Sequence, residues 1–530
     1  MQRVLVANRG EIALRIFRAC REEGISTVAV VAPDDRGSLH ARSAGSVVEI
    51  ASYLDPGEHV RAAREAGAEA VHPGYGFLAE SAELAEAVLA AGLVWIGPPP
   101  SALRAGGDKL AAKETARAAG VPVLPTGTPN EIGLPLLVKA AAGGGGRGMR
   151  VVRSAAELDD AVEAARREAA AAFGDDTVFF ERYLERPRHV EIQLLADRHG
   201  TLVALGERDC SVQRRHQKVL EESPSPAVGP ALREAMSEAA VAFARAIGYE
   251  SAGTAEFVLD GGNFYFLELN ARIQVEHPVT ELVAGVDLVR DQLRIAKGEV
   301  LVTGGSLRGH AVEVRLYAED PRTFLPQAGR IDRLVLPTSV RVDAGVAEGD
   351  EIGTAYDPMI AKLIALGDTR DEALDRLADA LRETEVGGVV TNLPFLRWLV
   401  DHPVVRAGEA TTAFLTEHPP LSRTPRAAPP WNAPWRLNLP SPPPAPPPSP
   451  EATPTSAQEL STLTAPMPGT VIKVLVQPGD RVAARRPLVV LEAMKMETPL
   501  VSPYDAVVRA VHVTEGERVA GGTLLVELEE

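Results

Sequence analysis

The sequence has little cysteine, few aromatic residues and fewer basic than acidic residues. Its two cysteines, Cys20 and Cys210, form no CxxC pair and offer no disulfide framework, which suits a reducing cytoplasm. The 55 Lys and Arg residues against 72 Asp and Glu give a net charge of −17, which argues against a general nucleic-acid or anionic-membrane surface. No apolar run approaches the length of a membrane span, and the N-terminus leads into an expected strand rather than a signal peptide. These absences predict a cytoplasmic protein that binds neither nucleic acid nor a membrane.

Proline, by contrast, is concentrated in one segment. Nine of the fifteen residues from 440 to 454 are proline. Such a segment cannot pack a core and is predicted to form semi-rigid polyproline II, reaching about 45 Å at ~3.1 Å per residue. Trp431 and Trp435 lie just upstream and are expected either to dock on the large N-terminal block, which we favour, or to form part of a partner site. The sequence therefore predicts a large block, a stiff linker and a small C-terminal domain.

The C-terminal domain contains an internal repeat. Residues 465–492, shifted by 37 positions, fall without a gap on residues 502–529, so that Pro466 matches Pro503 and Val474 matches Val511. Each copy is rich in alternating valines and is punctuated by Gly or Pro, which is typical of short strands. The repeat predicts two quasi-identical β halves joined by a hairpin, with Lys495 in the connection. A lysine displayed at such a turn is well placed to be modified.

Lys495 stands between Met494 and Met496. A lysine with apolar neighbours is usually a solvated amine beside a surface patch, but the repeat on both sides makes that explanation weak. The domain resembles the biotinyl carrier domain, whose modified lysine has the same Ala-Met-Lys-Met context. The lipoyl domain shares the fold but usually has Asp and Ala beside its lysine, so the two methionines favour biotin. The resemblance implies biotin joined covalently to Lys495 by a biotin protein ligase.

The large block opens with a β-α-β pattern. Residues 3–7 are predicted to be a strand, residues 10–23 a helix and residues 28–32 the next strand. This order predicts a parallel, doubly wound first subdomain, which places the block in the α/β class. No GxGxxG follows the first strand, so the sequence does not support dinucleotide binding there.

A glycine-rich run lies further on, at residues 143–148. Strands predicted over residues 134–139 and 149–152 flank it, so the glycines join a hairpin, whereas a Rossmann loop must lead into a helix. A helix is expected only from residue 155, where Ser154 and Glu157 have capping-box spacing. Glycines let backbone N–H groups approach phosphates, and Lys139 would add a positive charge. The run therefore predicts a lid over a triphosphate; a flexible solvent loop is the alternative for the glycines alone.

The densest pattern of polar residues lies between 254 and 276. Glu268, Asn270, Arg272, Gln274 and Glu276 alternate with apolar residues, which predicts one polar face if the extended chain persists. Glu256 lies on the preceding predicted strand. A three-residue turn near residues 261–262 would put Glu256 and Glu268 on the same face, and a two-residue turn would separate them. Two carboxylates and an amide together suit Mg²⁺, although chance alternation on a solvated edge strand is the simpler alternative.

Several motifs of the large block together resemble those of biotin carboxylase, an ATP-grasp enzyme. The resemblance runs from Asn8-Arg9-Gly10-Glu11-Ile12 to about residue 415. It includes His72-Pro73-Gly74-Tyr75-Gly76-Phe77, Gly107-Asp108-Lys109, Glu207-Arg208-Asp209-Cys210-Ser211 and Glu268-Leu269-Asn270-Ala271-Arg272-Ile273-Gln274-Val275-Glu276-His277-Pro278. Small departures are Ala142, where some relatives have glycine, and Arg182, where lysine is frequent; neither removes a catalytic side chain.

The resemblance implies a multidomain α/β fold with these parts: a Rossmann-like subdomain (1–110), an ATP-grasp domain (111–300) with a lid at about 125–185, a C-terminal subdomain (301–420), a proline-rich linker (421–460) and an all-β biotinyl/lipoyl-like carrier (461–530). It implies ATP binding by Lys109, Lys139, the lid glycines Gly144, Gly145 and Gly146, a hinge at Glu181 to Leu184, and His189, Gln213 and His216.

The resemblance also assigns the chemistry. It implies that Glu256, Glu268 and Asn270 hold Mg²⁺ or Mn²⁺, and that Lys218, Arg272, Gln274 and the Val275 backbone bind bicarbonate. Glu276 would deprotonate bicarbonate, which attacks the γ-phosphate of ATP to give carboxyphosphate. Arg315 would stabilise the negative charge that develops on the ureido oxygen of biotin, although by itself it could be an ordinary strand arginine. Cys210 is expected to be a packing residue, because no base partner is implied.

Together the two modules imply half of a biotin-dependent carboxylase. The 40 residues of the linker are too few for a carboxyltransferase, so a separate carboxyltransferase β subunit is expected, with the α chains as a homo-oligomer within a larger complex. By resemblance the acceptor is a short acyl-CoA such as acetyl- or propionyl-CoA, the former used in fatty acid biosynthesis; the sequence does not say which. Two alternatives are a different ATP-grasp ligase with a lipoyl-like appendage, and a carrier scaffold with an inactive ligase half.

Overall fold

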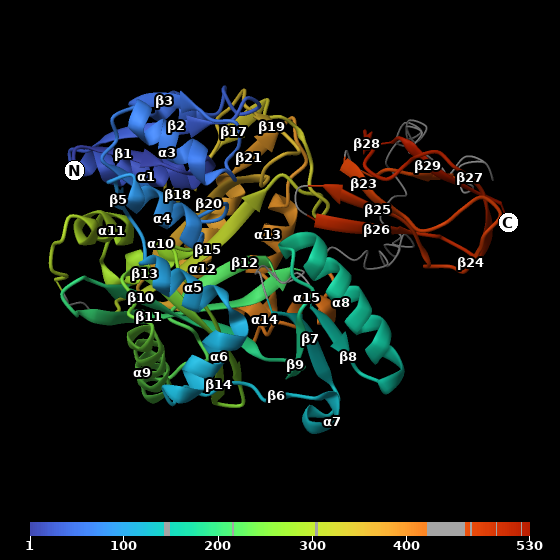
Figure 1. Ribbon diagram of the computed structural model, residues 1–530, viewed down its shortest axis with the longest axis horizontal. Helices are drawn as coiled ribbons and strands as arrows, with labels where there is room; N and C mark the ends of the chain where they lie inside the picture. Colours follow the sequence, from blue (N-terminus) through green and yellow to red (C-terminus); the bar gives the residue numbers. More distant parts are fainter. Residues whose placement is uncertain are drawn as a thin grey trace, which may run out of the picture.

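The computed structural model describes residues 1–141, 149–214, 217–302, 306–420, 462–466, 469–493, 496–520 and 522–529. In the described part, no helix has the length and apolar character needed to cross a membrane. Figure 1 shows the whole chain, coloured from the N-terminus to the C-terminus.

The first unit is a parallel sheet with helices on both faces, as the β-α-β pattern predicts. Its strand order is β3-β2-β1-β4-β5. The strands are β1 (Arg3–Val6), β2 (Ser26–Val31), β3 (Ser46–Glu49), β4 (Ala70–His72) and β5 (Val94–Trp95). The helices are α1 (Gly10–Glu22), α2 (Leu39–Ser43), α3 (Pro56–Glu65), α4 (Ala82–Ala90) and α5 (Pro100–Gly107). Val4 and Val6 pack on the side of α1, whereas Leu5 packs with α3 and α4, since successive strand residues point to opposite faces.

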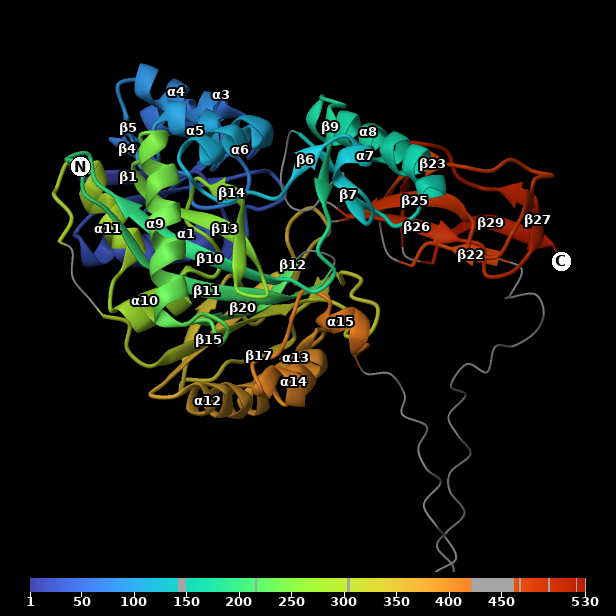
Figure 2. The ribbon, with the colours of Figure 1, turned by 90° about the horizontal axis from the view of Figure 1, so that it is seen from below.

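A larger antiparallel sheet forms the centre of the block (Figure 2). Its strand order is β14-β13-β10-β11-β12-β15-β20-β18. The strands are β10 (Arg188–Ala196), β11 (Leu202–Arg214), β12 (Gln217–Ser223), β13 (Ser251–Asp260), β14 (Asn263–Asn270), β15 (His310–Tyr317), β18 (Arg341–Ala344) and β20 (Met359–Gly367). The helices around it are α6 (Lys109–Ala118), α9 (Pro230–Ala246), α10 (His277–Ala284), α11 (Leu288–Ala296), α12 (Arg370–Glu383), α13 (Leu393–Val400), α14 (Pro403–Arg406) and α15 (Phe414–Glu417). Two short pairs complete the block: β16 (Gly329–Arg330) with β19 (Glu351–Ile352), and β17 (Arg333–Val335) with β21 (Glu385–Gly387).

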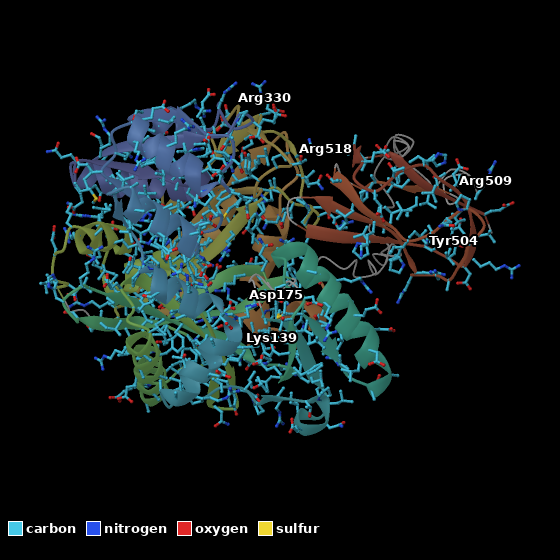
Figure 3. The ribbon with its side chains drawn as sticks, in the orientation of Figure 1. Lys139, Asp175, Arg330, Tyr504, Arg509 and Arg518 are labelled. Atoms are coloured by element: carbon cyan, nitrogen blue, oxygen red, sulfur yellow. The ribbon has the colours of Figure 1, made fainter. Side chains whose placement is uncertain are left out.

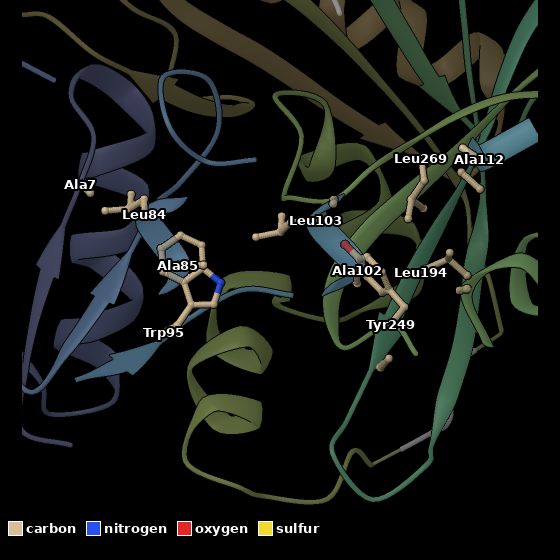
Figure 4. Close-up of a cluster of buried hydrophobic side chains, with 14 of the residues drawn as sticks. Ala7, Leu84, Ala85, Trp95, Ala102, Leu103, Ala112, Leu194, Tyr249 and Leu269 are labelled. Carbon is tan, nitrogen blue, oxygen red and sulfur yellow. The ribbon is translucent and has the colours of Figure 1, made fainter. Parts of the chain in front are cut away.

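A continuous apolar cluster joins the first sheet to the central sheet. Figure 4 shows Leu84 and Trp95 from the first unit, Leu103 from α5, and Leu194 and Leu269 from the central sheet. All five side chains are at most 3% exposed. Their burial fixes α5 and the strands that follow, and α5 leads directly into α6, whose first residue is Lys109.

The lid unit is a third sheet, with strand order β6-β9-β7-β8. It consists of β6 (Thr126–Gly127), β7 (Leu136–Ala140), β8 (Arg150–Val152), β9 (Val178–Arg182), α7 (Pro129–Ile132) and α8 (Leu158–Phe173). The antiparallel pairing of β7 with β8 confirms the predicted hairpin. The predicted helix start was three residues early: residues Ala155–Glu157 form a 3₁₀ turn and α8 begins at Leu158. The glycines Gly144, Gly145 and Gly146 lie outside the described residues.

A β-bulge places Glu256 opposite Glu268. Gly261 and Gly262 form a two-residue turn, with φ of 56° and 89°, between the paired residues Asp260 and Asn263. Both positive φ values suit a tight hairpin turn. In an unbroken ladder Glu256 would face Leu267, but the register shifts by one residue and Glu256 pairs with Glu268. The two-residue turn alone would have separated these carboxylates; the bulge brings them to one face.

The predicted extended chain from 267 to 276 does not persist. Strand β14 ends at Asn270, and α10 begins at His277 after an irregular segment. The period-two expectation is therefore wrong beyond Asn270. Because β14 ends at Asn270, a loop rather than a pleat directs residues 271–276.

The C-terminal domain follows the sequence repeat closely. Its strands are β22 (Thr462–Thr464), β23 (Gly469–Val474), β24 (Arg481–Val482), β25 (Pro487–Ala493), β26 (Met496–Val501), β27 (Ala506–Val511), β28 (Arg518–Val519) and β29 (Leu524–Glu529), drawn in orange to red in Figure 1. The 37-residue shift carries β23 onto β27 and β24 onto β28. The two sheets, β22-β29-β27-β24 and β26-β25-β23-β28, each contain strands from both halves, so neither half forms a sheet alone. Lys495 lies outside the described residues, between β25 and β26, where Ala493 pairs with Met496.

Candidate active site

A cleft of about 1080 Å³ lies between the lid unit and the central sheet. Its walls contain every predicted site residue of the large block that the structure describes. These residues are Lys109, Lys139, Glu181, Leu184, His189, Gln213, Lys218, Glu256, Glu268, Asn270, Arg272, Gln274, Val275, Glu276 and Arg315. Residues separated by more than 200 positions in the sequence therefore face one cavity.

One end of the cleft contains buried lysines around a single glutamate. Asp108 caps α6 by accepting from the N–H groups of Leu110 and Ala111, which fixes Lys109 at the start of the helix. Lys139, on lid strand β7 and labelled in Figure 3, donates to Glu181 Oε2 at 3.1 Å. Glu181 also forms an ion pair with Lys113, which is only 1% exposed. The side chain of Glu181 is therefore occupied by lysines, so only its backbone remains for the adenine hinge that the resemblance implied.

Lys218 is the central cation of the other end. Its Nζ donates to Glu191 Oε2 at 2.6 Å, to Glu276 Oε1 at 2.6 Å and to Glu256 Oε1 at 2.9 Å. Burial would lower the pKa of Lys218, but Glu191, Glu256 and Glu276 raise it well above its ordinary value. The ammonium is thus held charged among three carboxylates.

Glu276 lies between two cations. Arg315 Nη2 donates to Glu276 Oε2 at 3.0 Å, while Lys218 holds the other oxygen. Burial would raise the pKa of Glu276, but Lys218, Arg315 and Arg208 outweigh it and hold this pKa well below its ordinary value. Arg315 also forms an ion pair with Glu221, and its buried Nε–H has no hydrogen-bond partner among the described residues.

His189 connects the nucleotide side to Glu256. Its Nε2 lies 2.9 Å from Glu256 Oε2, and its Nδ1 is 3.0 Å from Gln213 Nε2. Burial would lower the pKa of His189, but Glu256 raises it above the ordinary value. Glu256 also accepts from Asn270 Nδ2 at 2.7 Å and from Gln274 Nε2 at 2.8 Å. Its carboxylate is therefore contacted by Lys218, His189, Asn270 and Gln274 together.

Family models cover nearly the whole chain. Residues 1–103 match the N-terminal domain of biotin carboxylase, and residues 313–417 match its C-terminal domain. Residues 108–303 match the ATP-binding domain of the carbamoyl-phosphate synthase L chain, and residues 461–528 match the domain of biotin-requiring enzymes. Biotin carboxylase of Halalkalibacterium halodurans is 47% identical over 441 residues, which cover 79% of this chain and 98% of that protein. This chain belongs to the biotin carboxylase family.

Two further relatives and one solved structure extend the comparison. The propionyl-CoA carboxylase alpha chain of Ruegeria pomeroyi is 46% identical, with 79% of this chain and 68% of that protein covered. The methylcrotonoyl-CoA carboxylase subunit alpha of Oryza sativa is 48% identical, with 79% and 60% covered. The biotin carboxylase domain of Hydrogenobacter thermophilus 2-oxoglutarate carboxylase, solved with MgADP, ADP and bicarbonate, is 43% identical with a TM-score of 0.77 and covers 79% of this chain and 98% of that one. As a biotin carboxylase with a biotin-requiring domain, the chain uses ATP, Mg²⁺ and biotin.

The oxygen donors of the cleft fit a magnesium ion. Glu256 and Glu268 present carboxylates from paired strands, and Asn270 adds an amide oxygen, an all-oxygen set of the kind Mg²⁺ prefers. Another group, His189, Glu191 and Glu256, brings its possible ligand atoms within 4.8 Å of one another, but it includes an imidazole. The facing carboxylates therefore have the donor chemistry that Mg²⁺ prefers.

Arg272 is held at the rim of the cleft. Its Nε donates to Glu80 Oε2 at 3.1 Å and its Nη2 to Asn270 Oδ1 at 2.9 Å. Glu80 also accepts from the N–H of Ala271 at 3.0 Å, so the loop between β4 and α4 fixes the start of the irregular segment. This contact joins residues 191 positions apart.

The sequence reasoning missed several residues of the biotin carboxylase site. They are Glu80, Lys113, Glu191, Arg208, Glu221 and Lys362. Arg208 is fully buried and donates to Glu191, Gln193, Thr254, Gln274 and Thr280. Two of these residues could have been found from the sequence, because Lys113 is one helical turn beyond Lys109 and Glu191 shares a strand face with His189. Of the predicted residues, His216, Gly144, Gly145, Gly146 and Lys495, with Trp431 and Trp435 of the linker, lie outside the described residues.

Proposed function

We propose that this chain is the α subunit of an acyl-CoA carboxylase, and that it carboxylates biotin attached to its own Lys495. The observation that carries the proposal is the cluster of Glu276, Lys218 and Arg315 in a chain that also contains a carrier domain. A carrier on the same chain as the carboxylase raises the effective concentration of biotin at the cleft.

Bicarbonate would bind where the cations meet Glu276. Lys218 and Arg272 would bind its negative charge, with Gln274 and the Val275 backbone as further partners. Lys362 Nζ donates to the Val275 oxygen at 2.6 Å and so fixes that backbone. When bicarbonate draws Lys218 toward itself, Glu276 loses part of the charge that holds its pKa low and becomes a stronger base. Substrate binding would thus activate the base.

Arg315 would then act on biotin. Its ion pair with Glu276 weakens once Glu276 has accepted the proton from bicarbonate, and its free Nε–H is available to another acceptor. A guanidinium aimed at the ureido oxygen stabilises the negative charge that develops there.

Nucleotide binding would use the opposite end of the cleft. Lys109 and Lys139 would contact the ATP phosphates, with the glycine run of the lid above them, and Glu256, Glu268 and Asn270 would hold Mg²⁺ against the phosphates. His189, Gln213 and His216 would line the nucleotide, and the hinge at residues 181–184 would lie under adenine. Mg²⁺ held by these residues would lower the charge repulsion between ATP and bicarbonate.

The acceptor we propose is a short acyl-CoA, acetyl- or propionyl-CoA. Support comes from the name of the Ruegeria relative, a propionyl-CoA carboxylase alpha chain. A separate carboxyltransferase β subunit would carry out the transfer, and a biotin protein ligase would modify Lys495. The α chains would form a homo-oligomer within this complex.

The test begins with the purified full chain, biotinylated at Lys495 as shown by mass spectrometry. We expect ATP- and bicarbonate-dependent carboxylation of free biotin by the chain alone, and carboxylation of an acyl-CoA only after the β subunit is added. A panel of acetyl-, propionyl- and methylcrotonoyl-CoA, with 2-oxoglutarate, identifies the acceptor. Acyl-CoA carboxylation by the chain alone, or transfer only to 2-oxoglutarate, would overturn the proposal.

A further inference from the structure

Two buried glutamates face each other beside the active site, and the mechanism above uses neither. Glu221 on β12 and Glu313 on β15 are direct partners in the antiparallel ladder. Directly opposed residues place their Cβ atoms about 4.5–5.5 Å apart on the same face of a sheet. That face is the one of the cleft, because Val312, Val314 and Leu316 occupy the other face of β15, in the core with α12.

The surroundings of the two carboxyls differ sharply. Both residues are 0% exposed. Glu221 forms an ion pair with Arg315. Neither carboxyl has a regular hydrogen bond among the described residues, but Glu313 also lacks an ion pair there, and its other cross-strand neighbour is the apolar Ile364. An isolated buried carboxylate is so costly that the group binds a proton instead.

Burial and the charges around the pair raise the pKa of both carboxyls. Arg315 offers a direct ion pair to Glu221, while Lys218 on β12, Lys362 on β20 and Glu276 before α10 act at longer range. Cys210 on β11, Tyr317 on β15 and His277 on α10 are further buried titratable groups near the pair or Arg315. Burial raises the pKa of the thiol and of the phenol and lowers that of the imidazole, which keeps all three neutral. Burial, only partly offset by Arg315, raises the pKa of Glu221 to about 7, and burial raises that of Glu313 well above its ordinary value. The charge of Glu221 is among the causes that raise the pKa of Glu313, so the protonation of one carboxyl bears on the other.

We propose that Glu221 and Glu313 share one proton and together position Arg315 for the carboxylation of biotin. With that proton in place, Glu313 is neutral, and the single negative charge of Glu221 holds the guanidinium of Arg315. Glu276 then competes for the same Nη2 group from the cleft side. Loss of the proton adds a second buried negative charge next to Glu221 and draws Arg315 away from the cleft. This inference rests on the role proposed above for Arg315.

The first test is thermal stability against pH, which needs no activity. Burial raises the folded-state pKa of both carboxyls above the unfolded value, so the stabilising contribution of their protonated forms is present at low pH. It is lost as pH rises, through about 7 for Glu221 and through the raised pKa of Glu313. Glu313→Gln keeps the shape but removes the titration. We expect the Tm of the full wild-type chain to fall, relative to that of Glu313→Gln, between pH 5 and pH 9. A pH-independent difference would overturn the shared proton.

The second test is the pH profile of free-biotin carboxylation. We expect Glu313→Gln to move the alkaline limb of kcat to higher pH. Glu221→Gln should lower kcat by about tenfold or more, with the KM for ATP changed less than about twofold, because only the position of Arg315 is disturbed. The matched control is Glu222→Gln on the same strand, whose side chain pairs with His310 and Arg370 away from the cleft. It should lower Tm without moving the profile.

The outcomes separate this inference from the proposed function. If the wild-type chain carboxylates biotin and both Glu221→Gln and Glu313→Gln leave the profile unchanged, the positioning role is wrong. Carboxylation of free biotin at the wild-type rate by an Arg315→Ala variant would contradict the role of Arg315 itself. The stability curves decide on the shared proton in either case.

Discussion

Lys218 Nζ lies 2.6 Å from Glu276 and 2.9 Å from Glu256, so one ammonium joins the proposed base to the proposed metal ligand. The same group also pairs with Glu191. Three carboxylates from three different segments therefore depend on a single positive charge.

Lys218→Met leaves three carboxylates buried together without their shared cation. Removing one partner of a buried ion pair typically costs about 3–5 kcal/mol, so we expect a lower Tm and a fall of about 10² or more in bicarbonate-dependent ATP hydrolysis. Phosphate release and thermal unfolding measure the two effects. Lys297→Met, at a half-buried surface pair with Glu23, is the control and should change neither strongly. A fully active Lys218→Met enzyme would contradict the assignment.

Glu276→Gln removes the proposed base while preserving its shape. General-base catalysis typically contributes about 10²–10⁴-fold, so kcat should fall by that factor while ATP still binds. Because the pKa of Glu276 is held well below its ordinary value, the stabilisation from its ion pairs is present above pH ~4.3 and is lost only as pH falls below that value. We expect the Tm difference between wild type and Glu276→Gln to be constant from pH 6 to 8 and to shrink in acid. A difference that changes across neutral pH would show that Glu276 titrates there.

Lys113→Met tests the shared use of Glu181. Lys113 and Lys139 both pair with this carboxylate. Without Lys113, the full negative charge of Glu181 acts on Lys139 and holds it away from a phosphate. We expect the KM for ATP to rise by about tenfold, with a smaller change in kcat, in steady-state kinetics. Lys113→Arg retains the charge and should stay closer to wild type; equal effects of the two variants would point to packing instead.

Lys495→Arg removes the attachment point for biotin and retains the charge. We expect no signal in a streptavidin blot and no acyl-CoA carboxylation with the β subunit present. Carboxylation of free biotin should stay near the wild-type rate, because the cleft is intact. Loss of both activities would mean that the carrier also supports the large block.

Phe266→Ala tests how the core supports the site. The ring is 0% exposed and lies 4.5 Å from that of Phe243 and 5.8 Å from that of Phe257, between centroids. Truncating a buried Phe typically costs about 3–5 kcal/mol, and Phe266 is two residues before Glu268. We expect a lower Tm and weaker Mg²⁺ binding, seen as a higher Mg²⁺ concentration for half-maximal activity. The half-buried Phe264 is a control: Phe264→Ala should cost less stability and leave the Mg²⁺ dependence unchanged.

Much of the site could be predicted because its residues occur in specific motifs, but the pattern argument failed at two points. Alternation correctly placed Glu268 and Asn270 on the cleft side of β14, yet Arg272, Gln274 and Glu276 reach the cleft from a loop. The prediction from turn length also failed, because it did not allow for a bulge. A two-residue turn separates Glu256 from Glu268, and only the bulge at Leu267 reunites them. Neither loop nor bulge has a local signature in the sequence.

The sequence by itself determined the two modules, the parallel first unit, the glycine hairpin and the β repeat around Lys495, because these depend on local periodicity and on motifs read along the chain. Only the tertiary structure decided which charges meet. Glu191, Arg208, Glu221 and Glu313 became part of the site through cross-strand pairing and burial, and the protonation of a carboxyl depends on the distances to charges from other segments. Those distances are set when the sheet forms, so they are invisible in the order of the residues.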